Sequence, residues 1–411
     1  MEKYEPMQQA QYDNIVIKLQ QGFRENFGIA PAILSRAPGR LEILGNHTDY
    51  NEGTVLSVAV DRAMHIAASP ASGLSGLCRV VDLVSGSRRS IDLHHLEQPR
   101  KGDWCNYIKG LIVELKKRDI SVPAFDAVLY GTVPLSAGMS SSAALEMAML
   151  LVLLKLAGRE LPWLDCAKIG QACENHYVGA NTGLLDQVSS LKGKKGNLIY
   201  SDFRSYKVEN VLIPEGTAFV VANSMVKHNL TNEYNERRQA CEEAVQILTG
   251  IYPGVKALRD VTVQQLHAAE TLLPSLVFRR ALHVVGEIDR VEKGCEALSK
   301  GQINRFGQLM QESHLSSRDL FENSCPEIDR LVEIGQTLPG YLGARISGGG
   351  FGGISVHLVQ AQFAQNYQQT LEKAYLDQCG IQTATMLCQA DDGAQLLNQI
   401  DPQENNPCSK I

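Results

Sequence analysis

The sequence predicts an α+β protein of two domains, and three observations support this. Strand-like and helix-like segments are mixed in both halves of the chain. At 411 residues the chain is longer than one hydrophobic core usually serves. A polar stretch near residues 201–215 separates two predicted strands, so we expect domains over residues 1–205 and 206–411.

Composition indicates a soluble globular protein, with 44% hydrophobic and 20% charged residues. The net charge of −6 and the lack of a long Lys/Arg run argue against a nucleic-acid surface. No run is long and apolar enough to span a membrane, and the first residues carry no apolar signal region. We therefore expect neither nucleic acid nor membrane as a partner, and a monomer or weak dimer.

The ten cysteines indicate a reducing compartment. None form a Cys-x-x-Cys pair, and several, such as Cys166 and Cys173, lie in apolar helical stretches. This pattern is typical of free thiols rather than of a disulfide frame or a zinc site. We expect a cytoplasmic protein.

In the first half, apolar residues at helical spacing predict helices over residues 12–27, 104–117, 143–156 and 164–177. Short apolar or alternating runs predict strands at 32–40, 41–44, 55–60, 64–68, 80–84, 90–93, 124–130 and 197–200. Pro38-Gly39 is expected to break the extended piece before residue 41, because proline lacks an N–H for the ladder.

In the second half, the same reasoning predicts helices over 233–249, 263–267, 275–300, 302–313, 325–335 and 361–375. Strands are predicted at 218–223, 354–359 and 383–387. A glycine-rich loop at 347–353 precedes the second of these strands. The predicted helices therefore outweigh the strands in this half.

Residues 133–146 form a Gly/Ser loop that runs into an apolar helix. A helix start offers unpartnered N–H groups and the positive end of the helix dipole, and small residues let the backbone approach an anion. Ser140, Ser141 and Ser142 can cap the helix or reach a phosphate or a metal. The Gly-Lys-Ser/Thr of a Walker A loop is missing. A phosphate cradle and an ordinary serine-capped helix fit this stretch about equally.

The glycine-rich loop satisfies the dinucleotide pattern with Gly348, Gly350 and Gly353. That pattern requires a helix after the loop, and here a strand follows, so the dinucleotide interpretation fails. A loop that approaches phosphate, or a tight turn between strands, remains. Two such loops without a P-loop lysine suggest a nucleotide held between domains.

His47 and Asp49 lie two residues apart, so an extended segment points both to one face. A carboxylate that accepts and an imidazole that donates suit the hydroxyl groups of a sugar. The alternative is a local turn that uses the side chains of Asp49 and Asn51.

Four further residues are candidates whose alternatives are structural. Asp186 follows a glycine-containing turn in a partly apolar setting, so it is either a general base or a helix N-cap. Glu174 is a magnesium ligand or a solvated charge. Tyr234 lies at a predicted helix start, where a tyrosine is usually a packing residue. Trp104 can stack on an aromatic ring or belong to the core.

Three separated motifs together resemble the GHMP kinases, and in particular the galactokinase family. They are Ala37-Pro-Gly-Arg40 with Gly45-Asn-His-Thr-Asp-Tyr-Asn51, then Pro134-Leu-Ser-Ala-Gly-Met-Ser-Ser-Ser-Ala143, then Arg345-Ile-Ser-Gly-Gly-Gly-Phe-Gly-Gly353. Segments 174–187 and 310–329 resemble the same family, so the resemblance covers nearly the whole chain. It implies a two-domain GHMP kinase architecture with the active site in the cleft between the domains.

The resemblance implies ATP-dependent phosphorylation of D-galactose at the anomeric C1 hydroxyl, giving galactose 1-phosphate and ADP, with Mg²⁺ as cofactor. Asp186 matches the catalytic base and Arg40 the arginine beside it, which favours an ionised carboxylate and stabilises phosphoryl charge. The implied sugar contacts are Arg40, Glu42, Asn46, His47, Asp49, Gly183, Asp186 and Tyr234. The implied nucleotide contacts are Trp104, Pro134, Ser136, Ala137, Gly138, Met139, Ser140, Ser141 and Ser142. The implied metal ligands are Ser141 and Glu174.

The chain departs from the family at two positions of the first motif. The family usually reads Arg-Val-Asn-Leu-Ile-Gly-Glu-His, whereas this chain reads Arg40-Leu-Glu-Ile-Leu-Gly-Asn-His47, so the Asn and the Glu have exchanged places. In the family that glutamate holds the 6-hydroxyl of the sugar. We expect Glu42 to reach the space beside Asn46 and compensate. The rival hypothesis is an altered C6 preference, with galacturonate or arabinose as the acceptor.

A third hypothesis is a galactokinase-like sensor that binds sugar and ATP without catalysis. Such a sensor is expected to carry damage in the phosphate loop, whereas residues 134–142, Arg40 and Asp186 all match the family. The resemblance therefore favours an enzyme.

Overall fold

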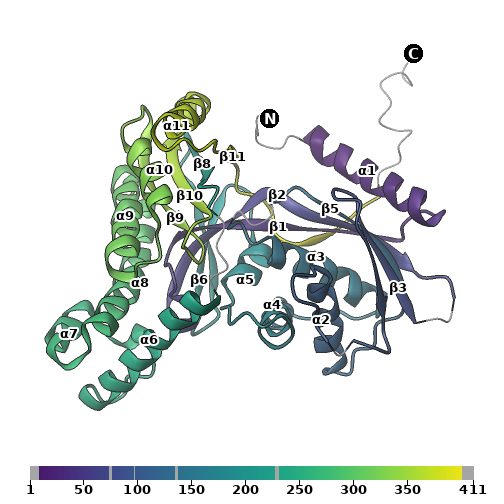
Figure 1. Cartoon of the computed structure of the whole chain (residues 1–411), viewed down its shortest axis with the longest axis horizontal. Helices are drawn as coiled ribbons and strands as arrows, with labels where there is room; N and C mark the ends of the chain where they lie inside the picture. Colours follow the sequence, from purple (N-terminus) through teal and green to yellow (C-terminus); the bar gives the residue numbers. More distant parts are fainter. Residues whose placement is uncertain (1–8, 74–75, 97, 135–137, 227–230, 400–411) are drawn as a thin grey trace.

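The computed structural model describes residues 9–73, 76–96, 98–134, 138–226 and 231–399. Within these ranges the chain forms an eight-stranded sheet and a four-stranded sheet, both covered by helices (Figure 1). This mixture in both halves agrees with the predicted α+β class. Among the described residues, no helix combines the length and apolar character that crossing a bilayer requires.

The larger sheet has the strand order β12-β1-β2-β5-β3-β4, and β6 pairs with β2 and β7. All of its neighbouring strands are antiparallel except β3 and β5, which are parallel. Its strands are β1 (Ile33–Leu44), β2 (Thr54–Pro70), β3 (Leu77–Asp82), β4 (Arg88–Asp92), β5 (Phe125–Gly131), β6 (Asn197–Asp202), β7 (Val208–Leu212) and β12 (Gln395–Leu397).

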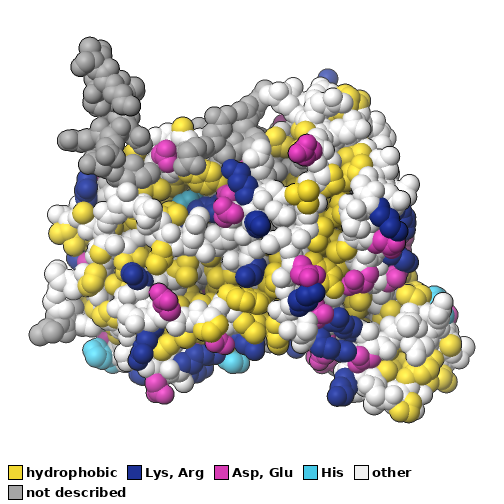
Figure 2. Space-filling model, turned by 180° about the vertical axis from the view of Figure 1, so that it is seen from behind, with side chains coloured by type: hydrophobic (Ala, Val, Ile, Leu, Met, Phe, Trp, Pro, Cys, Tyr) yellow, Lys and Arg dark blue, Asp and Glu magenta, His cyan; other side chains and the backbone are white. Residues whose placement is uncertain are grey.

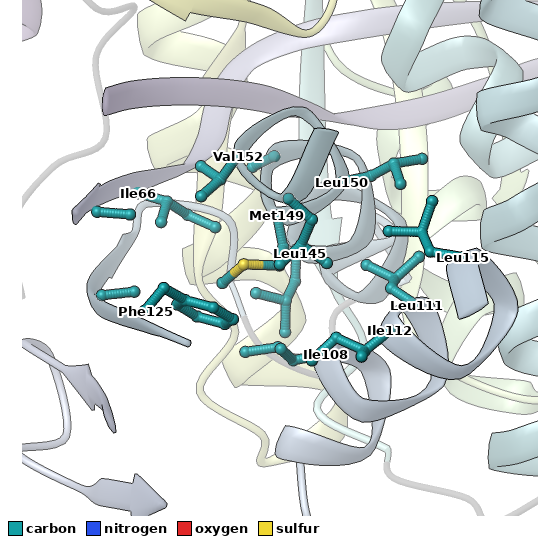
Figure 3. Close-up of a cluster of buried hydrophobic side chains, with 14 of the residues drawn as sticks. Ile66, Ile108, Leu111, Ile112, Leu115, Phe125, Leu145, Met149, Leu150 and Val152 are labelled. Carbon is teal, nitrogen blue, oxygen red and sulfur yellow. The ribbon is translucent and has the colours of Figure 1, made fainter. Parts of the chain in front are cut away.

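Helices cover both faces of the larger sheet (Figure 1). On one face α1 (Gln9–Phe27) buries Leu19 and Phe23 against the strands. The other face carries α2 (Cys105–Lys116), α3 (Ser141–Leu156), α4 (Trp163–Ala172) and α5 (Leu185–Lys192). Figure 3 shows apolar side chains of α2 and α3 meeting Ile66 and Phe125 of the sheet. This core fixes the start of α3 and therefore the loop before it.

Strand β1 is continuous through Pro38-Gly39, so the predicted break there is wrong. The pairing register between β1 and β2 shifts between Pro38 and Arg40, which absorbs the irregularity as a bulge. A Cβ on Gly39 would lie 2.6 Å from the carbonyl oxygen of Met139. The backbone N–H of Arg40 donates to that oxygen over 3.1 Å. The glycine therefore lets the loop before α3 approach β1 closely.

The smaller sheet has the strand order β11-β8-β10-β9 and is antiparallel. Its strands are β8 (Thr217–Asn223), β9 (Tyr341–Ser347), β10 (Ile354–Gln360) and β11 (Thr385–Cys388). The helices of this half are α6 (Thr231–Ile251), α7 (Val263–Ala268), α8 (Ser275–Ser299), α9 (Ile303–Ser316), α10 (Pro326–Gln336) and α11 (Ala364–Cys379). Residues of α10 and α11 pack on one face of this sheet.

A shared core joins the two halves. Leu41 and Ile43 of β1 and Val58 of β2 pack in one buried cluster with Val221 of β8 and Val356 of β10. Residues of α8 and α9 complete the cluster. The two sheets are therefore held together by hydrophobic burial and not by a flexible linker alone.

The sheet pairing bears on the expected domain boundary at residues 205 and 206. Strand β7 pairs with β6 in the larger sheet, although it follows that boundary, and β12 pairs with β1 in the same sheet. We therefore propose a boundary between Leu212 and Thr217, with residues 395–397 returning to the first domain.

Charged side chains are mixed on the surface. In Figure 2, Lys and Arg lie beside Asp and Glu across the face shown. The nine described cysteines are free, and six of them are buried.

Candidate active site

A cavity of about 170 Å³ lies where the two halves of the chain meet. It is lined by Arg40, Glu42, Asn46, His47, Asp49, Thr182, Gly183, Leu185, Asp186, Tyr234 and Gly349. All eight sequence-predicted sugar contacts are in this set. The structure also brings in Thr182, Leu185 and Gly349, which were not predicted.

Asp186 and Arg40 form an ion pair at this cavity. The Nε and Nη2 atoms of Arg40 lie 2.8 and 2.7 Å from Asp186 Oδ1, and Nη1 donates to the Gly138 carbonyl oxygen over 2.6 Å. The Ser140 hydroxyl donates to Oδ2 of the same carboxylate. Arg40 therefore links the carboxylate to the loop before α3.

Asp186 is not a helix N-cap, which corrects that alternative. It lies inside the first turn of α5, where Leu184 occupies the cap position. Its side chain keeps 25% of its surface exposed, compared with 7% for Arg40. The arginine is therefore held by the protein, while the carboxylate remains open to the cavity.

Asp49 packs against the turn before α5. A Cβ on Gly183 would lie 1.7 Å from Asp49 Oδ2, so only glycine fits there. The Leu185 N–H donates to the same oxygen over 3.5 Å. Burial, followed by the nearby Glu42 and Asp186 carboxylates, raises the pKa of Asp49 to about 6. Asp49 is thus a partly buried acceptor that lines the same cavity as Asp186.

His47 is a neutral ring with both nitrogens engaged by the protein. Nε2 lies 3.1 Å from the Gly349 carbonyl oxygen, which can only accept, so Nε2 carries the proton. Nδ1 then accepts from the Tyr50 hydroxyl at 2.9 Å. Burial lowers the pKa of His47 to about 4. Both ring nitrogens thus face protein groups, so a hydrogen bond from this imidazole to a sugar hydroxyl stays a prediction, and His47 lines the cavity.

Tyr234 lies over the same ring. The centroids of His47 and Tyr234 are 5.1 Å apart, and Tyr50 and Phe321 also contact this pair. The aromatic cluster forms an apolar wall of the cavity, which suits the C–H face of a sugar.

The exchanged residues Glu42 and Asn46 touch each other. Asn46 Nδ2 donates to Glu42 Oε1 over 2.8 Å and lies 3.0 Å from the Gly348 carbonyl oxygen. Both residues are buried, and both line the cavity. The family has its carboxylate at position 46. In this chain Glu42 supplies a carboxylate that is hydrogen-bonded to the residue at position 46.

Three residues that no sequence pattern identified as site residues hold this pair. Arg345 Nη1 lies 3.1 Å from Glu42 Oε1 and is fully buried. Asn323 Nδ2 donates to Asn46 Oδ1 over 2.9 Å. Glu287 Oε2 accepts from the backbone N–H groups of Gly45 and Asn46 at 3.0 and 2.9 Å.

The charges of these residues follow from burial and from their partners. Burial raises the pKa of Glu42, and the Arg345 and Arg40 guanidinium groups oppose that shift. Glu287 is fully buried, yet the positive charges of Arg290 and Arg345, together with the His283 ring and the Asn46 N–H, hold its pKa well below its usual range. Glu287 is therefore an ionised anchor beneath the loop at residues 45–47.

The predicted nucleotide loop is described in part. Ser136 and Ala137 lie outside the described residues. Gly138 and Ser140 both adopt positive φ, which turns the backbone into α3 at Ser141. Pro134, Met139, Ser141 and Ser142 flank this turn and do not line the cavity. The start of α3 thus lies beside Asp186, to which it is joined by Ser140 and by Arg40.

The metal candidates Ser141 and Glu174 lie at the start of α3 and in the turn after α4, respectively. Glu174, in the π-helical turn Cys173–Val178, is 4% exposed. Its carboxylate accepts from Thr182 Oγ1, and the Ser142 and Gln187 side chains lie beside it. Because the residue is buried, it is not a solvated surface charge. Burial raises its pKa to about 6. The Ser142 side chain lies beside the Glu174 carboxylate, and Ser141 at the metal remains a prediction.

Trp104 lies at the start of α2, apart from this cavity. The Arg89 guanidinium carbon stands 5.8 Å from its ring centroid, and the ring packs against the core of the first domain. The structure therefore leaves its role at a nucleotide base a prediction.

Three family models match this chain. The galactokinase galactose-binding signature matches residues 21–70, which contain Arg40 to Asp49. The GHMP kinases N terminal domain matches residues 106–194, and the GHMP kinases C terminal model matches residues 295–375. The three matches have the order of the three motifs.

Curated relatives and solved structures agree with these matches. A galactokinase of Roseiflexus sp. (strain RS-1) is 38% identical over 94% of this chain and 99% of its own length. A galactokinase of Homo sapiens is 37% identical over 95% of this chain and 99% of its own. The crystal structure of Lactococcus lactis galactokinase complexed with galactose superposes with a TM-score of 0.88 and 29% identity, covering 93% of this chain and 100% of that chain. Methanococcus jannaschii mevalonate kinase, at 17% identity and a TM-score of 0.60, shares the fold over 88% of this chain and 98% of its own. The chain therefore belongs to the galactokinase family of the GHMP kinases.

Proposed function

We propose that this chain transfers the γ-phosphoryl group of ATP to the anomeric C1 hydroxyl of D-galactose, giving galactose 1-phosphate and ADP. The observation that carries the proposal is that contacts connect the sugar cavity, through Asp186, to the start of α3. The Asp186 carboxylate opens into a cavity lined by sugar-binding side chains, and Arg40 and Ser140 connect it to the start of α3. Membership of the galactokinase family supports the same activity.

In this proposal Asp186 is the general base. Its carboxylate accepts the proton of the sugar hydroxyl as the new O–P bond forms and the bond to the leaving ADP oxygen breaks. Arg40 donates to Oδ1 and holds the carboxylate ionised, and it adds positive charge beside the loop that faces the phosphates. Arg40 is only 5% exposed, so this geometry is fixed before substrate binds.

The nucleotide is proposed to bind at the start of α3. The backbone N–H groups there and the positive helix end suit phosphate oxygens. Glu174 and Ser142 supply a carboxylate and a hydroxyl, a ligand pair that fits Mg²⁺, which is usually held by one or two protein groups together with phosphates and waters. We therefore propose Ser142, in addition to Ser141, as a serine at the metal. When bound, Mg²⁺ neutralises charge on the phosphoryl group.

Galactose is proposed to be held by Glu42, Asn46, Asp49 and the Tyr234 ring. A carboxylate at position 42 beside Asn46 keeps an acceptor for the 6-hydroxyl, despite the exchange. A C6 carboxylate would face both Glu42 and Asp49 in a buried cavity, which is unfavourable. This supports galactose over galacturonate. Arabinose would leave the Glu42 acceptor unused.

A coupled ADP-release assay with a panel of galactose, galacturonate and arabinose tests the proposal. We expect galactose-dependent ADP release that falls by at least about 100-fold in Asp186→Asn, because the general base is lost while the shape is kept. Galactose binding by calorimetry should persist in the variant and serves as its control. Wild-type protein that binds galactose and ATP but releases no ADP would identify a sensor and contradict an enzyme.

We further propose that the enzyme works in the cytoplasm as a monomer or weak dimer, on small molecules alone. Free cysteines and a surface of mixed charge support this (Figure 2). Light scattering after size-exclusion chromatography measures the mass directly.

A further inference from the structure

Helix α3 carries one buried acid, and neither the sequence motifs nor the proposed reaction accounts for it. Glu146 is 0% exposed in a helix whose other buried residues are apolar. A fully buried glutamate without a cationic partner is rare, because its carboxyl group loses its hydration on burial and then depends on hydrogen bonds within the protein. The groups that act most on Glu146 are Gln187, Cys173, Glu174 and Asp186, and none of them is a cation.

The partner of Glu146 is the residue next to the proposed base. Gln187 Nε2 donates to Glu146 Oε2 over 2.9 Å, and the same side chain lies beside the Glu174 carboxylate, whose pKa it lowers. Gln187 Oε1 is buried and meets no donor among the described residues. The amide is therefore held to α3 through its nitrogen, next to Glu174.

The space around this link leaves little freedom. A Cβ on Gly170 of α4 would lie 2.8 Å from Gln187 Cγ and 3.2 Å from Glu146 Oε2. The Cys173 thiol donates to the Tyr107 carbonyl oxygen over 3.2 Å and packs beside Glu146. Helices α2, α3, α4 and α5 thus enclose the Glu146–Gln187 pair from all sides.

The two glutamates differ in their surroundings. Glu146 accepts from the Gln187 amide and faces Glu174 and Asp186, so burial and these carboxylates raise its pKa well above its usual range. Glu174 accepts from the Thr182 hydroxyl and lies beside the Ser142 and Gln187 side chains. Of the two acids, Glu146 is therefore the one whose carboxyl group depends on the Gln187 amide.

We propose that Glu146 is a positioning residue: through the Gln187 amide it orients the Glu174 carboxylate and anchors the first turn of α5 that carries Asp186. This inference rests on the proposed function, because it concerns the alignment of the groups of that reaction. Without an acceptor at position 146, the Gln187 side chain loses its link to α3, and Glu174 loses a polar neighbour of fixed position. Supporting residues of this kind matter because misplacement by about 1 Å lowers rates about 100-fold.

The test compares Glu146→Gln with Glu146→Leu in the full-length protein. Glutamine is neutral and keeps an oxygen that accepts from Gln187, so we expect kcat within about threefold of wild type. Leucine has a similar size and no acceptor. We expect it to lower kcat and to raise the Mg²⁺ concentration for half-maximal activity, both by about 10- to 100-fold. The KM for galactose should change less than twofold, because Glu42, Asn46 and Asp49 are untouched.

Asp126→Leu is the matched control for loss of a buried acid. Asp126 of β5 is 2% exposed and is paired with Arg79 over 2.7 and 2.6 Å, away from the cavity lining. We expect this variant to lower the melting temperature without changing the Mg²⁺ requirement. An unchanged kcat and Mg²⁺ requirement in Glu146→Leu would overturn the inference, as would an equal loss in Glu146→Gln.

Gln187→Met tests the same link from the other side and serves if Glu146→Leu does not fold. We expect the same change in kcat and Mg²⁺ requirement, and no further loss when both substitutions are combined, because they break one connection. Effects that multiply in the double variant would contradict the inference. A wild-type protein inactive on galactose would overturn the proposed function instead, so the two failures are distinguishable.

Discussion

At the scale of single residues, the exchange of Glu42 and Asn46 shows how a buried charge can move while its function is kept. Burying an arginine without an opposite charge is unfavourable. Arg345 is buried, and its guanidinium group is paired with the Glu42 carboxylate. Asn46 then completes the set through hydrogen bonds to Glu42 and Asn323. The pair is therefore coupled, and each residue is suited to the other.

This coupling predicts the outcome of a double-mutant cycle. Glu42→Asn leaves Arg345 buried without its partner, and we expect it to raise the KM for galactose about 10-fold or more and to lower stability by about 3 kcal/mol. Asn46→Glu places a second carboxylate against Glu42, with a similar penalty. The double variant should be better than either single variant in both KM and melting temperature.

Additive losses in that cycle would contradict the coupling. Glu52→Gln is the control, because Glu52 follows the same loop but is 48% exposed on its side chain. Its substitution should leave the KM for galactose within about twofold of wild type.

The sequence predicted most residues that line the cavity, but not the buried residues that support them. Asp186 and Arg40 stand 146 positions apart, and it was their motifs that placed them together. The residues that support the cavity from beneath are Arg345, Asn323 and Glu287. No local sequence pattern distinguishes Glu287 from the other glutamates of α8. The hydrogen bonds that occupy both nitrogens of His47 likewise depend on Tyr50 and Gly349, which only the fold brings together.

At the scale of elements, the close packing of α9 on β9 depends on one glycine. A Cβ on Gly307 would lie 1.9 Å from the Leu342 carbonyl oxygen, and backbone cannot move aside as a flexible side chain can. Strand β9 ends at Ser347, whose hydroxyl accepts from the Glu42 N–H over 2.9 Å. The helix–strand contact therefore supports the floor of the sugar cavity.

We expect Gly307→Ala to lower stability by about 1–3 kcal/mol through overpacking, despite the helix propensity gained. Gly250→Ala in α6 is the matched control, since no atom lies within 4 Å of its added Cβ. That substitution should be neutral or should stabilise by up to about 1 kcal/mol. Thermal melting of both variants measures the difference. Equal melting temperatures would refute the argument from packing.

Element prediction succeeded where periodicity was long and failed where tertiary context decided. The helices predicted at 143–156 and 275–300 correspond closely to α3 and α8, because their apolar patterns extend over several turns. The helix predicted at 164–177 ends at residue 172 and continues as a π-helical turn that presents Glu174. Helix α5 and strands β7, β9 and β12 were missed, since each is short and is stabilised by its neighbours.

At the scale of the whole molecule, a cluster of ion pairs joins the two domains beside the shared hydrophobic core. Arg259 binds Asp202, at the end of β6, with its two Nη atoms at 2.5 and 2.7 Å. Arg204 joins Asp260 and Glu52, which follows the sugar-binding loop. Bidentate pairs with fixed geometry are the ion pairs that contribute measurably to stability.

The cluster predicts a specific acid dependence of stability. Arg259 and neighbouring backbone N–H groups outweigh burial and hold the pKa of Asp202 well below its usual range, and Arg204 lowers that of Asp260 to about 2. Because folded-state pKa values below the unfolded value of about 3.9 favour the native state at higher pH, this stability is present above about pH 4. It is lost as the pH falls toward 2.

Asp202→Asn is therefore expected to lower the melting temperature at pH 7 by a few degrees, corresponding to about 1–2 kcal/mol after allowance for partial exposure. The difference from wild type should shrink as the pH falls from 4 to 2, because wild type loses the same ion pair by protonation. Glu296→Gln, which removes an exposed pair with Lys300 on α8, is the control and should match wild type at each pH. A deficit in Asp202→Asn that stays constant down to pH 2 would assign its effect to packing and not to charge.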